Sequence, residues 1–222
     1  MESVLLADGL PAVCLYPSRS PDRPLIVLNS FAEEGDRVAE ACSGLDLSFL
    51  IIRDLRWDDD LSPWPAPALS KKDPPFSGGA DRHLSRIREE YLPEALKHIP
   101  GDPSFTAIAG YSMAGLFALY ALTRCDVFSR CASMSGSLWF PGAEDYLKTT
   151  KPVRMPERIY LSLGDREAKT RHPVLRTVQD TTEHLRDHYR SLGIDTRWEL
   201  NPGNHFTDPV SRTVRGIREI LD

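Results

Sequence analysis

The chain has 222 residues, which fits one domain or at most two small ones, because domains run to about 100–200 residues. It carries 27 basic and 32 acidic side chains, a net charge of −5 with histidine neutral, and 41% of its residues are hydrophobic. This ordinary globular composition excludes disorder, collagen, a coiled coil and a disulfide scaffold. The mild acidity argues against nucleic-acid binding, which usually needs a basic face, and no apolar run approaches the roughly 18 residues of a membrane span.

The N-terminal sequence MESVLLADGLPAVCLYP has no basic start, no sustained apolar core and no small-residue cleavage site, so we expect the chain to stay in the cytoplasm. Cysteine is sparse: no C-x-x-C pair occurs, and the cysteines lie far from clustered histidines. This pattern predicts reduced, partly buried thiols rather than a zinc site or disulfides. The four are Cys14, Cys42, Cys125 and Cys131.

Short apolar runs alternate along the chain with longer helical stretches. The predicted strands are residues 4–7, 12–16, 25–29, 49–53, 105–109, 131–135, 159–163 and 196–200. The predicted helices are residues 33–42, 81–98, 113–123, 173–191 and 209–221. Several strands are apolar at consecutive positions, which is typical of a strand buried on both faces.

Strand–helix alternation predicts an α/β fold with a mostly parallel central sheet and helices on both faces. The first two strands are joined only by ADGLP, which favours an antiparallel hairpin at the sheet edge. Residues 56–79 are rich in Pro, Asp, Ser and Gly, hold two tryptophans and lack periodicity, so we expect a surface excursion or a pocket wall there. We find no repeat and no linker, and predict a single domain over residues 1–222.

The most informative stretch is residues 106–122 (TAIAGYSMAGLFALYAL). A buried strand runs into GYSMAG, and a helix of small and apolar residues follows, which places Ser112 at the apex of a tight turn. This context matches a nucleophile elbow, G-x-S-x-G, of the α/β-hydrolases. The strained turn requires small neighbours, and Gly110 and Ala114 supply them, although Ala114 departs from the usual glycine. The structural alternative is a serine that caps a core helix.

A serine nucleophile needs a base, and histidine titrates in the suitable range. His205 lies in the turn-rich loop NPGNHF, after the last strand and before the final helix, where the catalytic histidine of this fold belongs. His172 opens a helix beside a proline and is interpreted as a capping-region residue. The others lie in polar helical stretches, which solvated helix faces explain; these are His83, His98, His184 and His188.

The acid should follow the strand RIYLSLG, where the loop offers Asp165 and Glu167. Either carboxylate could hold the imidazole in the correct tautomer, and the residues themselves do not separate them. The oxyanion donors should be backbone N–H groups: that of Met113, directly after the nucleophile, and one from the loop after the strand LIVLN. There we expect Phe31, with Ser30 as the alternative.

With these residues in place, the chain resembles the esterase D-like branch of the α/β-hydrolases, and within it the bacterial siderophore esterases that open the enterobactin, salmochelin and bacillibactin trilactones. The stretches that carry the likeness are residues 61–67, 76–81, 110–122, 135–139, 164–167 and 202–206. They extend over most of the chain from about residue 24. In this family the acid usually stands three residues after the glycine, so the resemblance favours Glu167 over Asp165.

The resemblance implies an α/β-hydrolase fold and hydrolysis of ester bonds, with the serine esters of a catecholate siderophore as a candidate substrate. It implies no cofactor and no catalytic metal, since iron would arrive only within the substrate. The chain is too short for a large lid, and Phe31, Trp64 and Trp139 are candidates to wall an open site, although ordinary packing also explains them. Arg53 and Arg56 are candidates to bind an anionic substrate.

The acidic run Asp58-Asp59-Asp60 lacks the spacing of a calcium loop and is interpreted as solvated loop charge. The expected partner is a small-molecule ester, with no nucleic acid and no membrane, and the sequence does not indicate an oligomeric state. The leading hypothesis is a cytoplasmic serine esterase that works through an acyl-enzyme. The alternatives are a general short-acyl carboxylesterase, a thioester hydrolase, an acyltransferase and a non-catalytic binding module.

Overall fold

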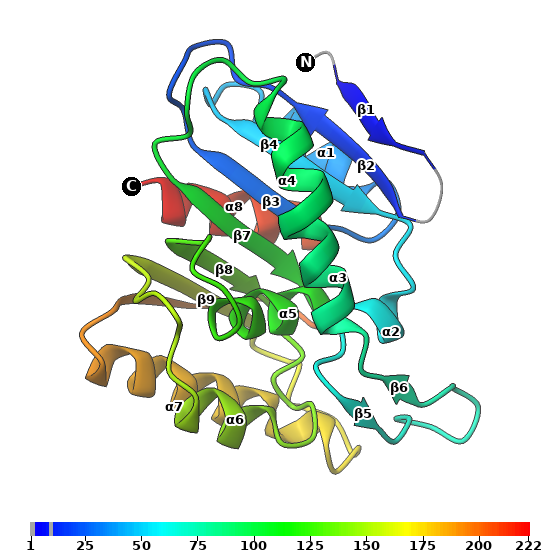
Figure 1. Ribbon diagram of the computed structural model, residues 1–222. Coiled ribbons are helices and arrows are strands. Elements are labelled where there is room, and N and C mark those ends of the chain that lie inside the picture. Colours follow the sequence, from blue (N-terminus) through cyan, green and yellow to red (C-terminus); the bar gives the residue numbers. More distant parts are fainter. Residues whose placement is uncertain (1–2, 9–10) are drawn as a thin grey trace. The chain divides into compact units, whose positions relative to one another are not determined.

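A computed structural model describes residues 3–8 and 11–222 (Figure 1). The chain divides into two compact units, Met1–Thr106 and Ala107–Asp222. Each unit builds its own layers of strands and helices. The prediction of one domain over residues 1–222 stays a prediction.

Four strands of the N-terminal unit pair in the order β1 (Val4–Ala7), β2 (Ala12–Tyr16), β4 (Ser48–Arg53) and β3 (Leu25–Asn29). β2 is antiparallel to both β1 and β4, whereas β3 and β4 are parallel. The predicted N-terminal hairpin is therefore confirmed, although Gly9 and Leu10 in its turn lie outside the described residues. All five residues of β3 are buried, as its unbroken apolar sequence predicts.

Helices lie on both faces of these strands, α1 (Glu34–Ala41) on one and α3 (Ala80–Arg86) with α4 (Leu92–Leu96) on the other (Figure 1). A π-helical turn, Ile87–Tyr91, joins α3 to α4. Pro93 explains this turn, because proline has no N–H to donate and its ring crowds the carbonyl four residues earlier. The single helix predicted over residues 81–98 is thus observed as a continuous helical segment with a π-helical turn in its middle.

Residues 56–79 contain a short helix, α2 (Trp57–Asp60), and a two-stranded ribbon of β5 (Pro65–Ala66) and β6 (Phe76–Ser77). The interpretation of the acidic run as solvated loop charge is wrong for two of its members. Asp59 and Asp60 lie in α2 and form ion pairs with Arg56 and Arg82, and Asp60 is only 7% exposed. The run therefore anchors this segment to α3.

The C-terminal unit holds four strands in the order β7 (Thr106–Tyr111), β8 (Arg130–Met134), β9 (Arg158–Gly164) and β10 (Asp195–Asn201). Every neighbouring pair is parallel. The carboxyl ends of parallel strands meet at one edge of a sheet. The loops that leave these four strands are therefore brought together, although they are far apart in sequence.

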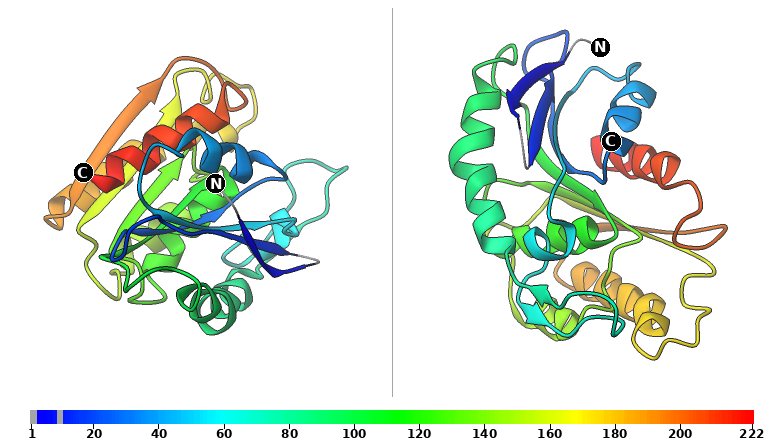
Figure 2. Two further views of the ribbon diagram at one scale, coloured as in Figure 1. Left: turned by 90° about the horizontal axis from the view of Figure 1, so that it is seen from above. Right: turned by 90° about the vertical axis from the view of Figure 1, so that its right-hand side faces the viewer.

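Helices cover both faces of these strands as well. One face carries α8 (Pro209–Leu221), and the other carries α5 (Met113–Leu122) and α7 (Val178–Ser191) (Figure 2). α7 begins five residues later than the helix predicted over residues 173–191. A 3-10 turn, Leu175–Thr177, directly precedes it. α6 (Ala143–Thr149), which packs against α7, was not predicted. It begins directly after Gly142, a residue in the left-handed conformation. Because the helix has only seven residues, its sequence carries little periodicity.

The predicted fold class is confirmed: mostly parallel strands, an antiparallel N-terminal hairpin, helices on both faces, and no large lid among residues 3–8 and 11–222. The four cysteines are buried thiols. No helix of the described part of the chain is long and apolar enough to cross a membrane. The same residues contain no cluster of three or more side chains that would suit a metal ion.

We expect Leu161→Ala in β9 to lower the free energy of unfolding by about 2–5 kcal/mol, because it leaves a cavity at a fully buried position. Leu200→Ala in β10 is the matched control, since Leu200 is 44% exposed and its truncation should cost under about 1 kcal/mol. Urea unfolding followed by circular dichroism measures both. Equal losses would contradict the burial described above.

Candidate active site

Ser112 lies between β7 and α5 in a backbone conformation that is strained for any residue but glycine, with φ 59° and ψ −124°. Its N–H donates to the carbonyl of Met134, and its own carbonyl accepts from Gly115 and Ser137. These bonds hold the strained residue in place. The predicted strand–turn–helix context is therefore present, with the serine at the turn.

The small residues around Ser112 are required by a close backbone approach. A Cβ atom added to Gly110 would lie 2.3 Å from the carbonyl oxygen of Ala114, well inside van der Waals contact. Any side chain at position 110 would thus push the end of β7 away from the first turn of α5. Ala114 itself is accommodated, although the usual motif has glycine there.

His205 reaches Ser112 from the loop that follows β10. Its Nε2 atom lies 3.0 Å from Ser112 Oγ, and its Nδ1 atom lies 2.7 Å from Glu167 Oε2. Because an ionised carboxylate can only accept, the Nδ1 proton faces Glu167 and leaves Nε2 to accept from the serine hydroxyl. The imidazole is 28% exposed, whereas the Glu167 side chain is 4% exposed.

The structure distinguishes the two carboxylates that the sequence left open. Glu167 contacts His205, whereas Asp165 accepts a hydrogen bond from the Gly203 N–H at 2.8 Å. The backbone adds two more bonds between the same loops, Asp165 N–H to Asn201 and Arg166 N–H to Gly203. Asp165 therefore joins the loop that carries Glu167 to the loop that carries His205.

One oxygen of Glu167 is saturated by donors, which leaves the other for His205. Oε1 accepts from Ser135 Oγ at 2.7 Å, from the Gly164 N–H at 2.7 Å and from Arg212 at 3.2 Å. Burial by itself raises the pKa of the Glu167 carboxyl, but the hydrogen bonds from His205, Ser135 and Gly164 outweigh it and hold the pKa below its usual range. The carboxylate is thus ionised at neutral pH.

Arg212, on α8, was not predicted from the sequence. It is 5% exposed and donates to Tyr111 Oη, Ser135 Oγ and Glu167 Oε1, each at 3.2 Å, and to the carbonyl of Pro202 at 2.9 Å. An arginine in an amphipathic helix usually indicates a solvent-exposed position, so no sequence signal marked it. It ties together the end of β7 and the loops after β8, β9 and β10.

Two serines that follow β8 contact Glu167 and Ser112. Ser135 has φ 45°, the left-handed region, and its hydroxyl donates to Glu167. The Oγ atom of Ser137, a 1% exposed residue, lies 3.3 Å from Ser112 Oγ. The sequence showed these residues only as part of a family likeness.

The other predicted site residues are placed as follows. Met113 opens α5, where first-turn N–H groups have no acceptor within the helix, and Trp139 is half-buried two residues after Ser137. Phe31 follows β3 in the N-terminal unit, is 59% exposed and packs its ring edge-on against Trp57. Trp64, in the same unit, is half-buried. The roles expected of these four residues stay predictions.

The structure also bears on three residues away from Ser112, namely His83, Arg53 and Arg56. His83, expected on a solvated helix face, is 2% exposed and bonds Asn29 Oδ1 at 2.8 Å, and burial lowers its pKa to about 4. The guanidinium of Arg53 pairs with Asp36, and that of Arg56 pairs with Asp59 and Asp60. Both arginines considered for anion binding are thus engaged within the N-terminal unit.

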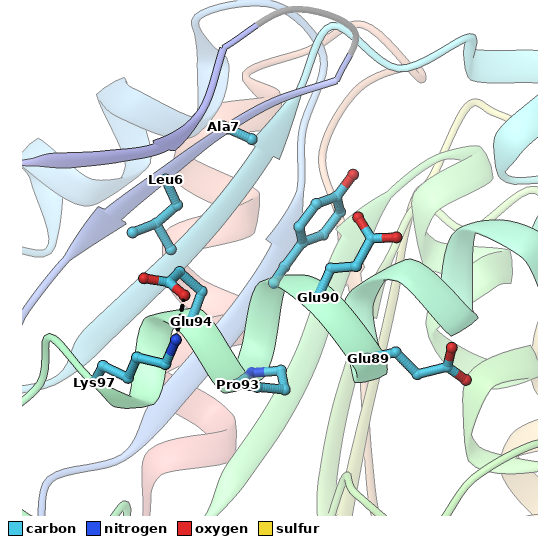
Figure 3. A pocket seen from close by; sticks show the side chains of 8 residues that line it. Leu6, Ala7, Glu89, Glu90, Pro93, Glu94 and Lys97 are labelled. Carbon is cyan, nitrogen blue, oxygen red and sulfur yellow. Dashed lines mark hydrogen bonds and ion pairs between the residues drawn. The ribbon is translucent and has the colours of Figure 1, made fainter.

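The N-terminal unit also has a hollow of its own, between β1 and α4 (Figure 3). Glu89, Glu90 and Glu94 line it, and Glu94 pairs with Lys97 at 2.6 Å. Its described lining contains no histidine, serine or cysteine. It therefore lacks the serine or cysteine with a nearby histidine that is seen around Ser112.

The chain is similar to known proteins in sequence and in fold. The sequence profile of the family described as "Putative esterase" matches residues 51–205, more than half of the chain. The "Uncharacterized protein YbbA" of Bacillus subtilis (strain 168) is 25% identical over 190 residues, 84% of this chain and 74% of that protein. The "Iron(III) enterobactin esterase" of Dickeya dadantii (strain 3937) is 39% identical over only 61 residues, 26% of this chain and 14% of that protein.

Solved structures share the fold. The IroE-like serine hydrolase from Shewanella oneidensis superposes with a TM-score of 0.81 at 19% identity, covering 98% of this chain and 79% of that chain. The siderophore hydrolase EstA from Aspergillus nidulans gives 0.74 at 17% identity, covering 99% and 93%. The enterobactin esterase from Shigella flexneri gives 0.69 at 19% identity, and this chain spans 55% of its length.

We expect Arg212→Met to lower the free energy of unfolding by about 3–5 kcal/mol, because it leaves the buried Glu167 carboxylate without its cation. Arg215→Met, on the same helix, is the matched control. Arg215 is 52% exposed in its pair with Glu199, and exposed pairs contribute about 0–1 kcal/mol. Chemical unfolding of both variants gives the comparison, and a loss at Arg212 no larger than that at Arg215 would refute this role.

Proposed function

Because the chain belongs to the "Putative esterase" family, we propose that it hydrolyses carboxylic esters as a serine esterase, through an acyl-enzyme on Ser112. The observation that carries the proposal is the continuous line of hydrogen bonds from Ser112 Oγ through His205 to Glu167. This is the arrangement of nucleophile, base and orienting acid that acyl transfer requires.

In the first half of the reaction, Ser112 Oγ attacks the ester carbonyl while His205 Nε2 takes its proton. Glu167 stabilises the imidazolium that forms and keeps the ring in the required tautomer. The negative charge on the carbonyl oxygen develops beside the start of α5, where the Met113 N–H and the helix dipole favour it. We assign the second donor to the N–H of Phe31. The alternative expected from the sequence, Ser30, is wrong, because its N–H donates to the Ile52 carbonyl at 3.0 Å.

The first half ends when the C–O bond to the alcohol breaks and the imidazolium gives its proton to the departing alcohol oxygen. In the second half, water attacks the acyl-enzyme with His205 again as the base, the bond between the acyl carbon and Ser112 Oγ breaks, and the carboxylic acid leaves. The proton that water loses returns to Ser112 Oγ, so the enzyme is regenerated without a cofactor. The acid must remain ionised throughout, and the lowered pKa of Glu167 supports this.

For the substrate, we propose a trilactone siderophore ester, hydrolysed in the cytoplasm. The support comes from relatives described as siderophore hydrolases and enterobactin esterases. Trp64 and Trp139 would contact the aromatic parts of such a substrate. A general short-acyl carboxylesterase is the runner-up, since the same triad serves it equally.

We expect Ser112→Ala to lower kcat on p-nitrophenyl acetate by about 10⁴–10⁶-fold, because the acyl-enzyme cannot form without the nucleophile. Ser191→Ala is the control, since Ser191 is exposed at the end of α7. A fluorophosphonate should label wild type and the control at one site per chain and leave Ser112→Ala unlabelled. Labelling of a folded Ser112→Ala protein would overturn the mechanism.

The same proteins are then given a triscatecholate trilactone in iron-free and ferric forms, and the products are analysed by chromatography. This distinguishes the two proposed substrate classes. Ser112-dependent opening of the trilactone supports the siderophore ester. Cleavage of the simple ester alone transfers the assignment to the general carboxylesterase. A folded chain that turns over neither ester would count for a binding module or for acyl transfer to another acceptor.

We expect Glu167→Gln to lower kcat by about 10⁴-fold, because the amide cannot stabilise the imidazolium and favours the wrong tautomer. Asp165→Asn is the matched control: it keeps an acceptor for the Gly203 N–H and should cost much less. Steady-state kinetics with circular dichroism of each variant decides between them. A larger loss at Asp165 than at Glu167 would reverse the assignment of the acid.

A further inference from the structure

Phe206, directly after His205, is the most exposed large apolar side chain among the described residues, at 85%. Exposed apolar residues are common on protein surfaces, so exposure alone indicates nothing. Two further features single this one out. Its backbone is fixed by a dense set of hydrogen bonds, and its ring packs against the imidazole of His205.

The loop that carries Phe206 is held on both sides. The Phe206 N–H donates to Asn204 Oδ1 at 2.9 Å, and three further bonds, of 3.0, 3.1 and 3.2 Å, join Asn204 and Thr207. Gly203 before them has φ 107°, a conformation that essentially only glycine adopts, and its N–H bonds Asp165. The ring is therefore held outward by the main chain rather than exposed through looseness of the loop.

The imidazole contacts two aromatic rings. Tyr111 contacts it with ring centroids 5.5 Å apart, and its hydroxyl donates to the His205 carbonyl at 2.8 Å. Phe206 meets the imidazole edge-to-face, with centroids 5.2 Å apart and planes at 88°. Tyr111 is half-buried and supports the base from within, so the exposed ring of Phe206 is the one that an incoming molecule can touch.

The direction of proton transfer decides which part of the ester would lie there. When the acyl-enzyme forms, His205 Nε2 gives its proton to the oxygen of the departing alcohol, so the alcohol portion must lie beside the imidazole at that moment. A ring packed on the imidazole is then a neighbour of the alcohol portion. The acyl portion stays on Ser112 while the alcohol departs.

We propose that Phe206 is the alcohol-side subsite, where its exposed ring contacts an aromatic or bulky apolar group on the alcohol portion of the ester. This inference rests on the proposed function and adds to it the substrate class: esters whose alcohol carries a ring close to the ester oxygen. Burying such a ring against Phe206 removes apolar surface from water, and edge-to-face or offset stacking adds to the gain.

Three esters test this. Benzyl butyrate and ethyl butyrate give the same butyryl-enzyme but differ in the alcohol, whereas ethyl 4-phenylbutyrate carries its ring on the acyl side. We expect Phe206→Ala to lower the ratio of kcat/KM for benzyl butyrate over ethyl butyrate by about tenfold. The ratio for ethyl 4-phenylbutyrate over ethyl butyrate should hold, and so should the rate at which the butyryl-enzyme is hydrolysed.

Phe206→Tyr, which keeps the ring, should restore the benzyl preference, and Leu200→Ala is the control for loss of an exposed apolar side chain elsewhere. Three results would contradict the subsite. The first is an equal loss of kcat/KM on all three esters with slower deacylation, which would make Phe206 a support for His205. The others are a loss of kcat/KM confined to ethyl 4-phenylbutyrate, and no change in either ratio.

A Ser112→Ala arm separates this inference from the proposal beneath it. Wild-type turnover that survives Ser112→Ala would refute the proposed function, and the subsite with it. Turnover that depends on Ser112 but shows no effect of Phe206→Ala on the benzyl ratio would refute the subsite alone.

Discussion

The candidate site depends on one buried carboxylate. Glu167 is 4% exposed, and three donors converge on its Oε1 atom: a backbone N–H, the Ser135 hydroxyl and the Arg212 guanidinium. A buried charge without partners would be prohibitively costly. Because these donors satisfy one oxygen and fix the plane of the carboxylate, the other oxygen has a single orientation, and that orientation defines where His205 must lie.

The parallel strands of the C-terminal unit explain how such distant residues meet. Ser112 follows β7, Ser135 follows β8, Glu167 follows β9 and His205 follows β10. Since the carboxyl ends of neighbouring parallel strands share one edge, each strand delivers one component of the site. Arg212, on the helix that crosses the face of these strands, then bonds to all four strand ends or the loops that follow them. The order and direction of the strands in this unit therefore set the positions of the site residues.

Strain and tight packing are concentrated at this edge. Ser112 and Ser135 both have positive φ, and both are held by bonds from neighbouring strand ends. Such conformations persist only where the surroundings fix them. The same rigidity holds Phe206 outward beside the base, so a loop that orients His205 also presents an apolar ring. Positioning of the base and contact with substrate would then come from one short turn.

The features of this protein that depend on local contacts could be predicted from its amino-acid sequence. Buried apolar runs predicted the strands, and the small residues around Ser112 predicted the elbow, because a strained strand–turn–helix junction excludes larger side chains. His205 was predicted as the base from its place after the last strand, and the structure places its Nε2 atom 3.0 Å from Ser112 Oγ. α6 and the late start of α7 were missed, since short helices and 3-10 turns carry little periodicity.

The features that depend on contacts between distant segments became visible in the folded chain. Asp165 and Glu167 stand two residues apart on one turn, and no local rule separates them; the position of the loop after β10 does, by placing Gly203 against one and His205 against the other. Arg212 resembles any surface arginine until α8 packs on the strands and buries it. Local sequence specifies backbone conformation, whereas the pairing of charges is specified by where distant segments meet.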